Sequence, residues 1–144
     1  MTEQSMTERS IAVPAWLRLA RVFQQVDHAS VDLLRRWDLS VAQFDVLVHV
    51  GLREGVTQQQ LADHLLVTKG NVCQLLDRME ERGWLVRRQE GRANRLYLTE
   101  KGRALRAEAL PAQEQLIEGI FAALPRDEQG ALLATLRRLD HSLA

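Results

Sequence analysis

The sequence of 144 residues lacks most of the features that enzymes, metal sites and membrane spans require. Its one cysteine, Cys73, excludes an internal disulfide and suits a reducing compartment, so we expect a cytoplasmic protein. No apolar run approaches the ~20 residues of a membrane span, and the polar N-terminus is unlike a signal peptide. Gly-rich phosphate loops, zinc-ligand spacings and nucleophile elbows are missing, so we predict no catalytic residue, metal or cofactor.

The sequence also lacks net charge, since it has 19 basic and 19 acidic residues, and this alone argues against a nucleic-acid partner. The distribution of the charges argues for one. Residues 85–106 contain seven Lys or Arg against two Glu, a local excess of five positive charges. Such a run fits either an ordinary solvated face or a phosphate-binding surface.

Apolar residues recur at helical spacing along most of the chain, which predicts a mainly α-helical fold of six helices and one β-hairpin. We expect these helices at about residues 14–37, 41–52, 58–64, 69–82, 100–123 and 126–142. The first would be about 36 Å long, more than a small domain needs to cover itself. Its apolar stripe therefore predicts a surface that meets a partner.

Three consecutive helices begin with the same capping signature. Ser40 with Gln43 forms a capping box, Thr57 with Gln60 repeats it, and Thr68 precedes Asn71 at the same spacing. Only about four residues separate the third helix from the fourth, which is typical of a helix-turn-helix. The fourth helix would then be the recognition helix of a DNA-binding motif.

The pattern changes to a hairpin after Gly83, which is placed to end the fourth helix in the left-handed conformation. Segments 84–86 and 95–98 are β-rich and flank a polar tip at 89–94, and Thr99 can cap the next helix. A hairpin directly after a helix-turn-helix is a wing. The sequence therefore predicts a winged helix-turn-helix.

Polar and basic residues at the start of the recognition helix, at the start of the helix-turn-helix and on the wing are the candidate DNA contacts. Amide side chains pair with adenine, lysine reaches guanine acceptors, and arginine suits the narrow minor groove. Strand alternation places Arg87 and Arg88 on opposite faces, so only one should meet DNA. The predicted DNA-binding residues are Thr57, Gln58, Thr68, Lys69, Gly70, Asn71, Gln74, Arg78, Arg88, Arg92 and Arg95.

Two other side chains of the recognition helix have competing interpretations. Arg82 is expected to reach a phosphate or to pair with Asp77 or Glu81. Cys73 could sense oxidants, but no cation is obviously placed to activate its thiol. We therefore interpret Cys73 as a small packing residue.

Four stretches together resemble the MarR (multiple antibiotic resistance regulator) family of bacterial winged-helix regulators. They are LSVAQFDVL at 39–47, TQQQLADHL at 57–65, VTKGNVCQLLDRMEERGWLVRR at 67–88 and LYLTEKGRAL at 96–105. The resemblance covers about residues 11–143 and implies a single domain over 1–144. In it, residues 11–37 and 99–143 would form the dimerisation helices of a homodimer, and 40–98 the DNA-binding part.

The resemblance also implies a function. Such a dimer binds a palindromic operator in double-stranded DNA, usually as a repressor, and a small-molecule or oxidant signal releases it. An effector pocket between the dimerisation helices and the helix-turn-helix would make Trp16, His28 and His49 candidate contacts, although scattered histidines are more often ordinary surface residues. The wing departs from the family, which commonly has Asp-Arg-Arg at its tip, where this chain has Glu90, Gly91 and Arg92.

A winged-helix module that binds protein rather than DNA is the alternative function. Such an interaction face would be expected to carry aromatic residues. The arginine-rich wing and the polar start of the recognition helix favour DNA.

Overall fold

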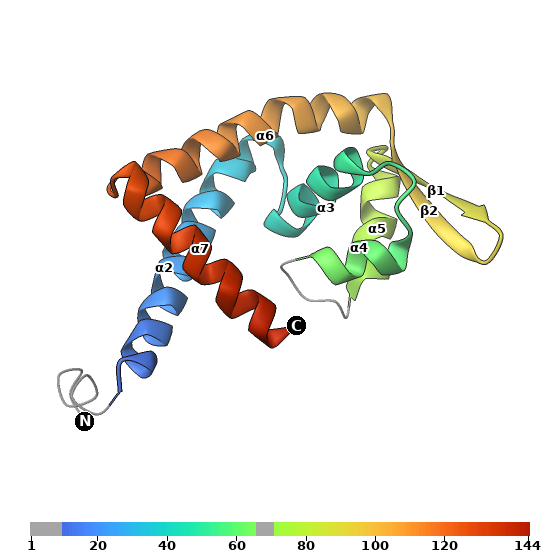
Figure 1. Cartoon of the computed structure of the whole chain (residues 1–144). Coiled ribbons are helices and arrows are strands. Elements are labelled where there is room, and N and C mark those ends of the chain that lie inside the picture. Colours follow the sequence, from blue (N-terminus) through green and yellow to red (C-terminus); the bar gives the residue numbers. More distant parts are fainter. Residues whose placement is uncertain (1–9, 66–70) are drawn as a thin grey trace. The chain divides into compact units, whose positions relative to one another are not determined.

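Residues 10–65 and 71–144, which the computed structural model describes, form mainly helices with one antiparallel hairpin (Figure 1). Helix α2 spans Ala12–Leu34 and continues into a 3-10 turn, η1, at Arg35–Trp37. Helices α3 (Val41–Leu52), α4 (Gln58–His64) and α5 (Val72–Glu81) follow. The hairpin of β1 (Leu85–Glu90) and β2 (Ala93–Leu98) precedes α6 (Glu100–Phe121) and α7 (Arg126–Leu143). The predicted fold class is confirmed.

The chain divides between Gln113 and Glu114 into two compact units. In the second, Gln129 of α7 donates to the carbonyl oxygens of Phe121 and Leu124, at 2.9 and 3.1 Å, and so secures the turn between α6 and α7. All the candidate DNA-binding residues that the structure describes belong to the first unit. None of the described helices combines the length and apolar character needed to cross a membrane.

Reciprocal capping boxes set the starts of α3 and α4, as predicted. Ser40 Oγ accepts from the Gln43 N–H at 3.1 Å, while Gln43 Oε1 accepts from the Ser40 N–H at 3.0 Å. Thr57 and Gln60 make the same pair of bonds at 3.1 and 3.0 Å. Each box satisfies two backbone N–H groups that the first turn of a helix leaves free.

The predicted limits of the first and fourth helices were wrong by a few residues. The first leaves α geometry after Leu34, because Asp38 adopts a left-handed φ of 53° and the Leu39 N–H turns back to the Leu34 carbonyl at 3.1 Å. Helix α5 begins at Val72 rather than near 69, because the backbone of Asn71 (φ −120°, ψ 24°) is not helical. The predicted cap, Thr68, lies outside the described residues.

A left-handed glycine ends the recognition helix α5 and turns the chain toward the wing. Gly83 has φ 78°, its N–H donates to the Glu80 carbonyl, and the Trp84 N–H donates to the Met79 carbonyl, both at 3.0 Å. These two bonds form a Schellman motif. Trp84 is buried just beyond it, so the turn also anchors the base of the wing in the core.

Strand pairing in the wing extends further than the predicted strands. It runs from Leu85 opposite Leu98 to Glu90 opposite Ala93 and leaves only Gly91 and Arg92 in the turn, so the predicted tip at 89–94 was too wide. Gly91 has φ 63°, as the first position of a type II′ turn requires. The tight turn places Arg92 at the end of the hairpin.

One hydrophobic core in the first unit supports α5 and the wing together. It includes Leu34 of α2 and Leu47 of α3, and it receives Leu76 from α5 and Leu96 from β2. Ala109 of α6 is also fully buried in it. Aliphatic side chains dominate this core, as expected from an aromatic content of 5%.

Gly102 lets α6 approach the backbone of the wing's base. A Cβ at this position would lie 2.0 Å from the Trp84 carbonyl oxygen, a backbone atom that cannot rotate away. We predict that Gly102→Ala destabilises the protein by about 3 kcal/mol and lowers Tm by roughly 6–12 °C in thermal unfolding. The matched control is Gly130→Ala in α7, where a Cβ meets nothing within 4 Å. It should leave Tm unchanged or raise it, and equal losses in both variants would contradict the packing argument.

Candidate nucleic-acid interface

Helix α5 has one buried and one exposed face. Val72, Leu76 and Met79 are buried in the core. Gln74 and Arg78 are exposed on the remainder of the helix, and Asn71 is exposed at its N-cap position. Because hydrophobic packing fixes the helix from one side, its polar side chains are presented to the solvent as a rigid set.

A recess of about 480 Å³ lies where the starts of α4 and α5 meet the wing tip. It brings together three predicted contacts, Thr57, Gln58 and Arg92, from two distant segments of the chain. Its lining residues are Thr57, Gln58, Gln59, Ala62, Val72, Cys73, Arg92, Ala93 and Asn94. Amide and guanidinium groups dominate its polar part, and these groups can donate to phosphate oxygens.

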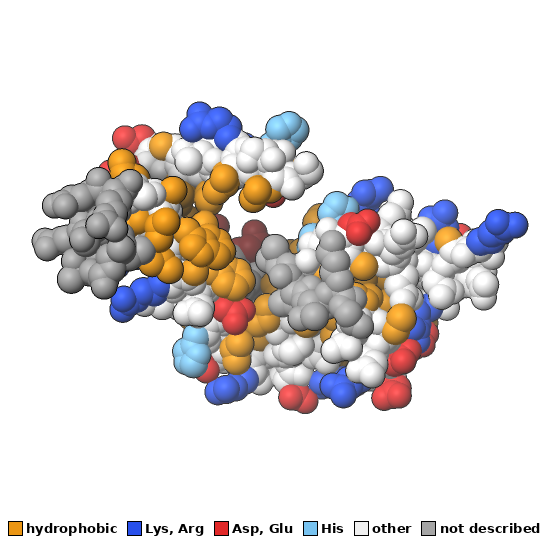
Figure 2. Space-filling view, turned by 90° about the horizontal axis from the view of Figure 1, so that it is seen from below, with side chains coloured by type: hydrophobic (Ala, Val, Ile, Leu, Met, Phe, Trp, Pro, Cys, Tyr) orange, Lys and Arg blue, Asp and Glu red, His pale blue; other side chains and the backbone are white. Residues whose placement is uncertain are grey.

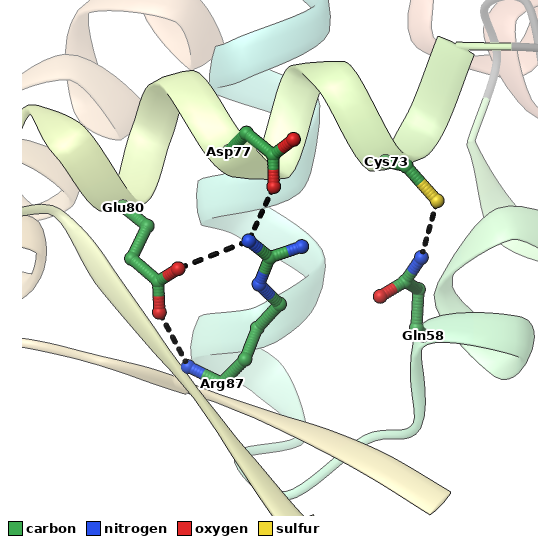
Figure 3. A network of polar contacts seen from close by, with 5 residues as sticks. All are labelled: Gln58, Cys73, Asp77, Glu80 and Arg87. Atoms are coloured by element: carbon green, nitrogen blue, oxygen red, sulfur yellow. Dashed lines mark hydrogen bonds and ion pairs between the residues drawn. The ribbon is translucent and has the colours of Figure 1, made fainter.

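Cys73 and Asn94 belong to this recess but were missing from the predicted site. Cys73 is exposed, and its sulfur accepts a hydrogen bond from Gln58 Nε2 at 3.0 Å (Figure 3). The interpretation of Cys73 as a packing residue was therefore wrong. Its position next to buried Val72 could have shown this, since adjacent helical residues point in different directions.

Arg87 fastens the wing to the recognition helix (Figure 3). Its guanidinium donates to Asp77 and, at 3.0 Å, to Glu80, and its backbone N–H donates to the other Glu80 carboxylate oxygen at 3.2 Å. The hydrogen bond to Asp77 is the main cause that raises the pKa of Arg87, and Glu80 adds to it against the opposing effect of burial. Since Arg87 is engaged within the chain, Arg88 is the one of the two that remains available.

The segment before α4 pairs with β2 and holds the wing from its other side. The Gly55 N–H donates to the Leu96 carbonyl at 2.8 Å, and the Leu96 N–H donates to the Val56 carbonyl at 2.9 Å. A further bridge joins Thr57 to Arg95. The helix-turn-helix and the wing are therefore connected through backbone hydrogen bonds as well as side chains.

Glu54 completes the attachment at the base of the wing. Its carboxylate accepts from the Leu98 N–H at 2.7 Å and from Arg103 Nη2 at 2.7 Å. Burial alone would raise the pKa of Glu54, but the hydrogen bonds from Arg103 and Leu98 outweigh it and lower the pKa. The stabilisation by this carboxylate is therefore present above the unfolded-state pKa and is lost as the pH falls through the lower, folded-state value.

Four side chains share the outer face of the wing. Arg95 donates through Nη1 to the Gly55 carbonyl at 2.8 Å and pairs through Nε with Glu90 at 3.2 Å. Tyr97 donates its hydroxyl to Glu90 at 3.3 Å, and the Arg88 guanidinium lies 5.1 Å from the centre of the Tyr97 ring. Arg92 is exposed at the tip.

Three predicted contacts and Arg82 remain to be placed. Thr68, Lys69 and Gly70 lie outside the described residues. Arg82 does not pair with Asp77 or Glu81. It donates to the carbonyl and carboxylate of Asp38 at 2.9 and 3.1 Å and stacks over Trp84 at 4.1 Å. It is an internal clamp because η1 returns the chain to the end of α5, an approach that helical spacing does not reveal.

The histidines and Trp16 form no common site among the described residues. His49 stacks on His64 with ring centroids 6.0 Å apart and contacts Asp45 at 3.2 Å. His28 instead lines a shallow recess on α2 with Arg21, Gln24 and Gln25. Across residues 10–65 and 71–144, no group of three or more His, Cys, Asp or Glu side chains could hold a metal ion.

Comparison with known proteins places this geometry in a family. Residues 37–95 match the sequence profile described as the MarR family. An HTH-type transcriptional regulator of Bacillus cereus is 35% identical over 136 residues, which cover 94% of this chain and 92% of that protein. The structure of a MarR mutant from Escherichia coli in complex with operator DNA is similar, with a TM-score of 0.80 and 25% identity over 89% of this chain and 94% of that one.

A second similar structure is a transcriptional regulator described as organohalide-sensing, in its 2,4-dichlorophenol-bound form. The TM-score is 0.81 at 22% identity, covering 92% of this chain and 81% of that one. At this identity the likeness concerns the fold.

The Arg87 attachment generates a testable difference between two adjacent residues. We predict that Arg87→Gln lowers the free energy of unfolding by about 1–2 kcal/mol, because it removes hydrogen bonds to two carboxylates from a side chain that is 22% exposed. Arg88→Gln on the opposite face should cost less than about 0.5 kcal/mol. Urea denaturation measures both, and a larger loss for Arg88→Gln would refute the assignment of Arg87 as the anchor.

Proposed function

The chain belongs to the MarR family of DNA-binding transcriptional regulators, and on that premise we propose that its homodimer represses genes from a palindromic operator and is released by a small molecule. The relatives and the structural neighbours are transcription regulators, not enzymes. The observation that carries the DNA-binding part is the recess in which wing-tip Arg92 lies with residues at the start of α4 and α5. A duplex seated there would meet the recognition helix and the wing at once.

We assign the contacts by chemistry and position. Asn71 and Gln74 would read base edges from α5, since amide side chains pair bidentately with adenine. Thr57, Gln58, Arg78 and Arg88 would contact the sugar-phosphate backbone. Arg92 would enter the minor groove at the wing tip.

The proposed interface also keeps Arg95 and three residues outside the described part of the chain, Thr68, Lys69 and Gly70. Their place in the sequence, directly before α5, supports this assignment.

Exposed apolar side chains on α2 support the homodimer. Trp16 is 64% exposed, Phe23 56% and Leu17 52%, in a helix where only Ser30 and Leu34 are buried. Exposed hydrophobic side chains appear in orange in Figure 2. A concentration of large apolar side chains marks a partner surface, and the resemblance to MarR-family proteins favours a second copy of the chain. Two recognition helices related by a two-fold axis would read half-sites about one helical turn, ~10 base pairs, apart.

A small-molecule effector is supported by analogy with a neighbour of the same fold. The organohalide-sensing regulator has a 2,4-dichlorophenol-bound form. We propose release by a ligand of this general kind, a small molecule rather than a macromolecule. Trp16, His28 and His49 remain its candidate contacts on the resemblance alone.

Two substitutions should separate the electrostatic contribution of the wing tip from base reading by α5. We expect Arg92→Ala to weaken binding to all duplexes. It should also flatten the slope of log K against log salt by about 0.9, the value expected when one phosphate fewer is neutralised. Gln74→Ala should leave that slope unchanged and relax preference at one base position, at a cost of roughly 1–3 kcal/mol. Fluorescence titration with duplexes selected from a random pool, at ~50 to ~200 mM salt, tests both. Identical effects of the two variants on every sequence would overturn the assignment.

Dimerisation is testable on α2. We predict that Phe23→Asp converts the dimer to monomer in sedimentation experiments and weakens operator binding by at least about tenfold, because it places a charge in an apolar contact. Gln25→Asp introduces the same charge on the same helix at an exposed polar position and serves as the matched control. A wild-type protein that is monomeric at micromolar concentration would exclude the homodimer.

A further inference from the structure

The wing contains one acidic residue, Glu90, among its four arginines, and it stands directly before the two-residue turn. We propose that Glu90 neutralises Arg95 by forming an ion pair with it, and thereby limits the affinity of the wing for DNA of any sequence. This inference rests on the DNA-binding function proposed above. It assigns to Glu90 a role that opposes binding, whereas the other residues of the interface promote it.

The strand register brings Glu90 and its partners to one face. Arg88 lies opposite Arg95, and Glu90 follows Arg88 by two residues, so their side chains project to the same side of the hairpin. Both carboxylate oxygens of Glu90 are engaged, one with Arg95 Nε at 3.2 Å and the other with the Tyr97 hydroxyl at 3.3 Å. The Arg95 Nη1 donates to the Gly55 carbonyl at 2.8 Å. Arg95 is therefore held from two directions, by a charged and a neutral acceptor.

The other two wing arginines that do not bind α5 differ from Arg95, because no carboxylate of the described residues pairs with them. Arg92 has no ion pair within the described part of the chain, and Arg88 is placed over the Tyr97 ring. Of the wing arginines not bound to α5, Arg95 alone among the described residues is neutralised by a carboxylate. The Arg95 and Glu90 side chains are 40% and 51% exposed, so the pair is accessible to an approaching phosphate.

The Glu90–Arg95 pair can respond to an approaching duplex in two ways, and both weaken binding. If Arg95 stays with Glu90, the wing neutralises one phosphate fewer. If Arg95 moves to a phosphate, an unpaired carboxylate remains beside the DNA backbone and repels it. Either outcome lowers the number of counterions released by about one. Phosphates are alike in all sequences, so the effect is independent of sequence.

Replacement of Glu90 by its neutral isostere tests the proposal. For Glu90→Gln we expect the slope of log K against log salt to become steeper by about 0.9, which corresponds to roughly eightfold tighter binding near 0.1 M salt. The probes are a 30-base-pair duplex of random sequence and a duplex selected by the wild-type protein. Both should gain equally. The matched control is Glu100→Gln, which removes one negative charge at the start of α6, separated from the wing tip by the whole of β2.

A double-mutant cycle shows whether Arg95 mediates the gain. Arg95→Gln in the Glu90→Gln background should abolish it, while Arg95→Gln alone should weaken binding to both duplexes, because it leaves the Glu90 carboxylate unpaired beside the DNA backbone. An unchanged or weaker affinity of Glu90→Gln overturns the proposal, and so does a gain that survives the loss of Arg95. Wild-type protein that binds neither duplex would instead refute the DNA-binding function, so the two failures are distinguishable.

Discussion

The close contact between the first turn of α6 and the backbone of Trp84 determines how α5 and the wing are held. Thr99 accepts from the Gly102 N–H at 3.0 Å, its own N–H donates to the Trp84 carbonyl at 3.0 Å, and its hydroxyl donates to Gly83. The chain just after the recognition helix is thereby bound to the chain just after the wing. With Arg87 bridging β1 to α5, the helix and the hairpin are joined by side-chain as well as backbone hydrogen bonds.

Local signals in the sequence predicted most of the fold because the interactions behind them are local. The capping boxes at Ser40 and Thr57 join residues three apart, and Gly83 ends α5 through its own φ. The clamp of Arg82 on Asp38 spans 44 residues and was not foreseen, because it depends on how the 3-10 turn η1 returns toward α5. The same holds for the pairing of residues 55–57 with β2. Contacts between distant segments require the packed structure.

The charge cluster of residues 85–106 illustrates how far the sequence can mislead about a site. Its seven basic residues suggested either a solvated face or a phosphate surface, but five serve the fold. Arg87 binds α5, Arg95 binds Glu90 and Gly55, and Lys101 donates to the Arg82 carbonyl. The other two, Arg103 and Arg106, donate to Glu54 and to the Val48 carbonyl. Within the described part of the chain, only the side chains of Arg88 and Arg92 in this cluster stand clear of such acceptors, so the basic part of the interface is smaller than the composition suggests.

Helix α7 carries apolar side chains but buries none of its residues within the described chain. Leu133 is 49% exposed, Leu139 51% and Leu143 78%. In the proposed homodimer another copy of the chain would bury these side chains, so folding and assembly would be linked by mass action. In such a homodimer, dilution would lower stability, and a cell that made slightly less of the chain would lose dimer more than proportionally. The amount of chain made would thus itself control how much assembled protein is present.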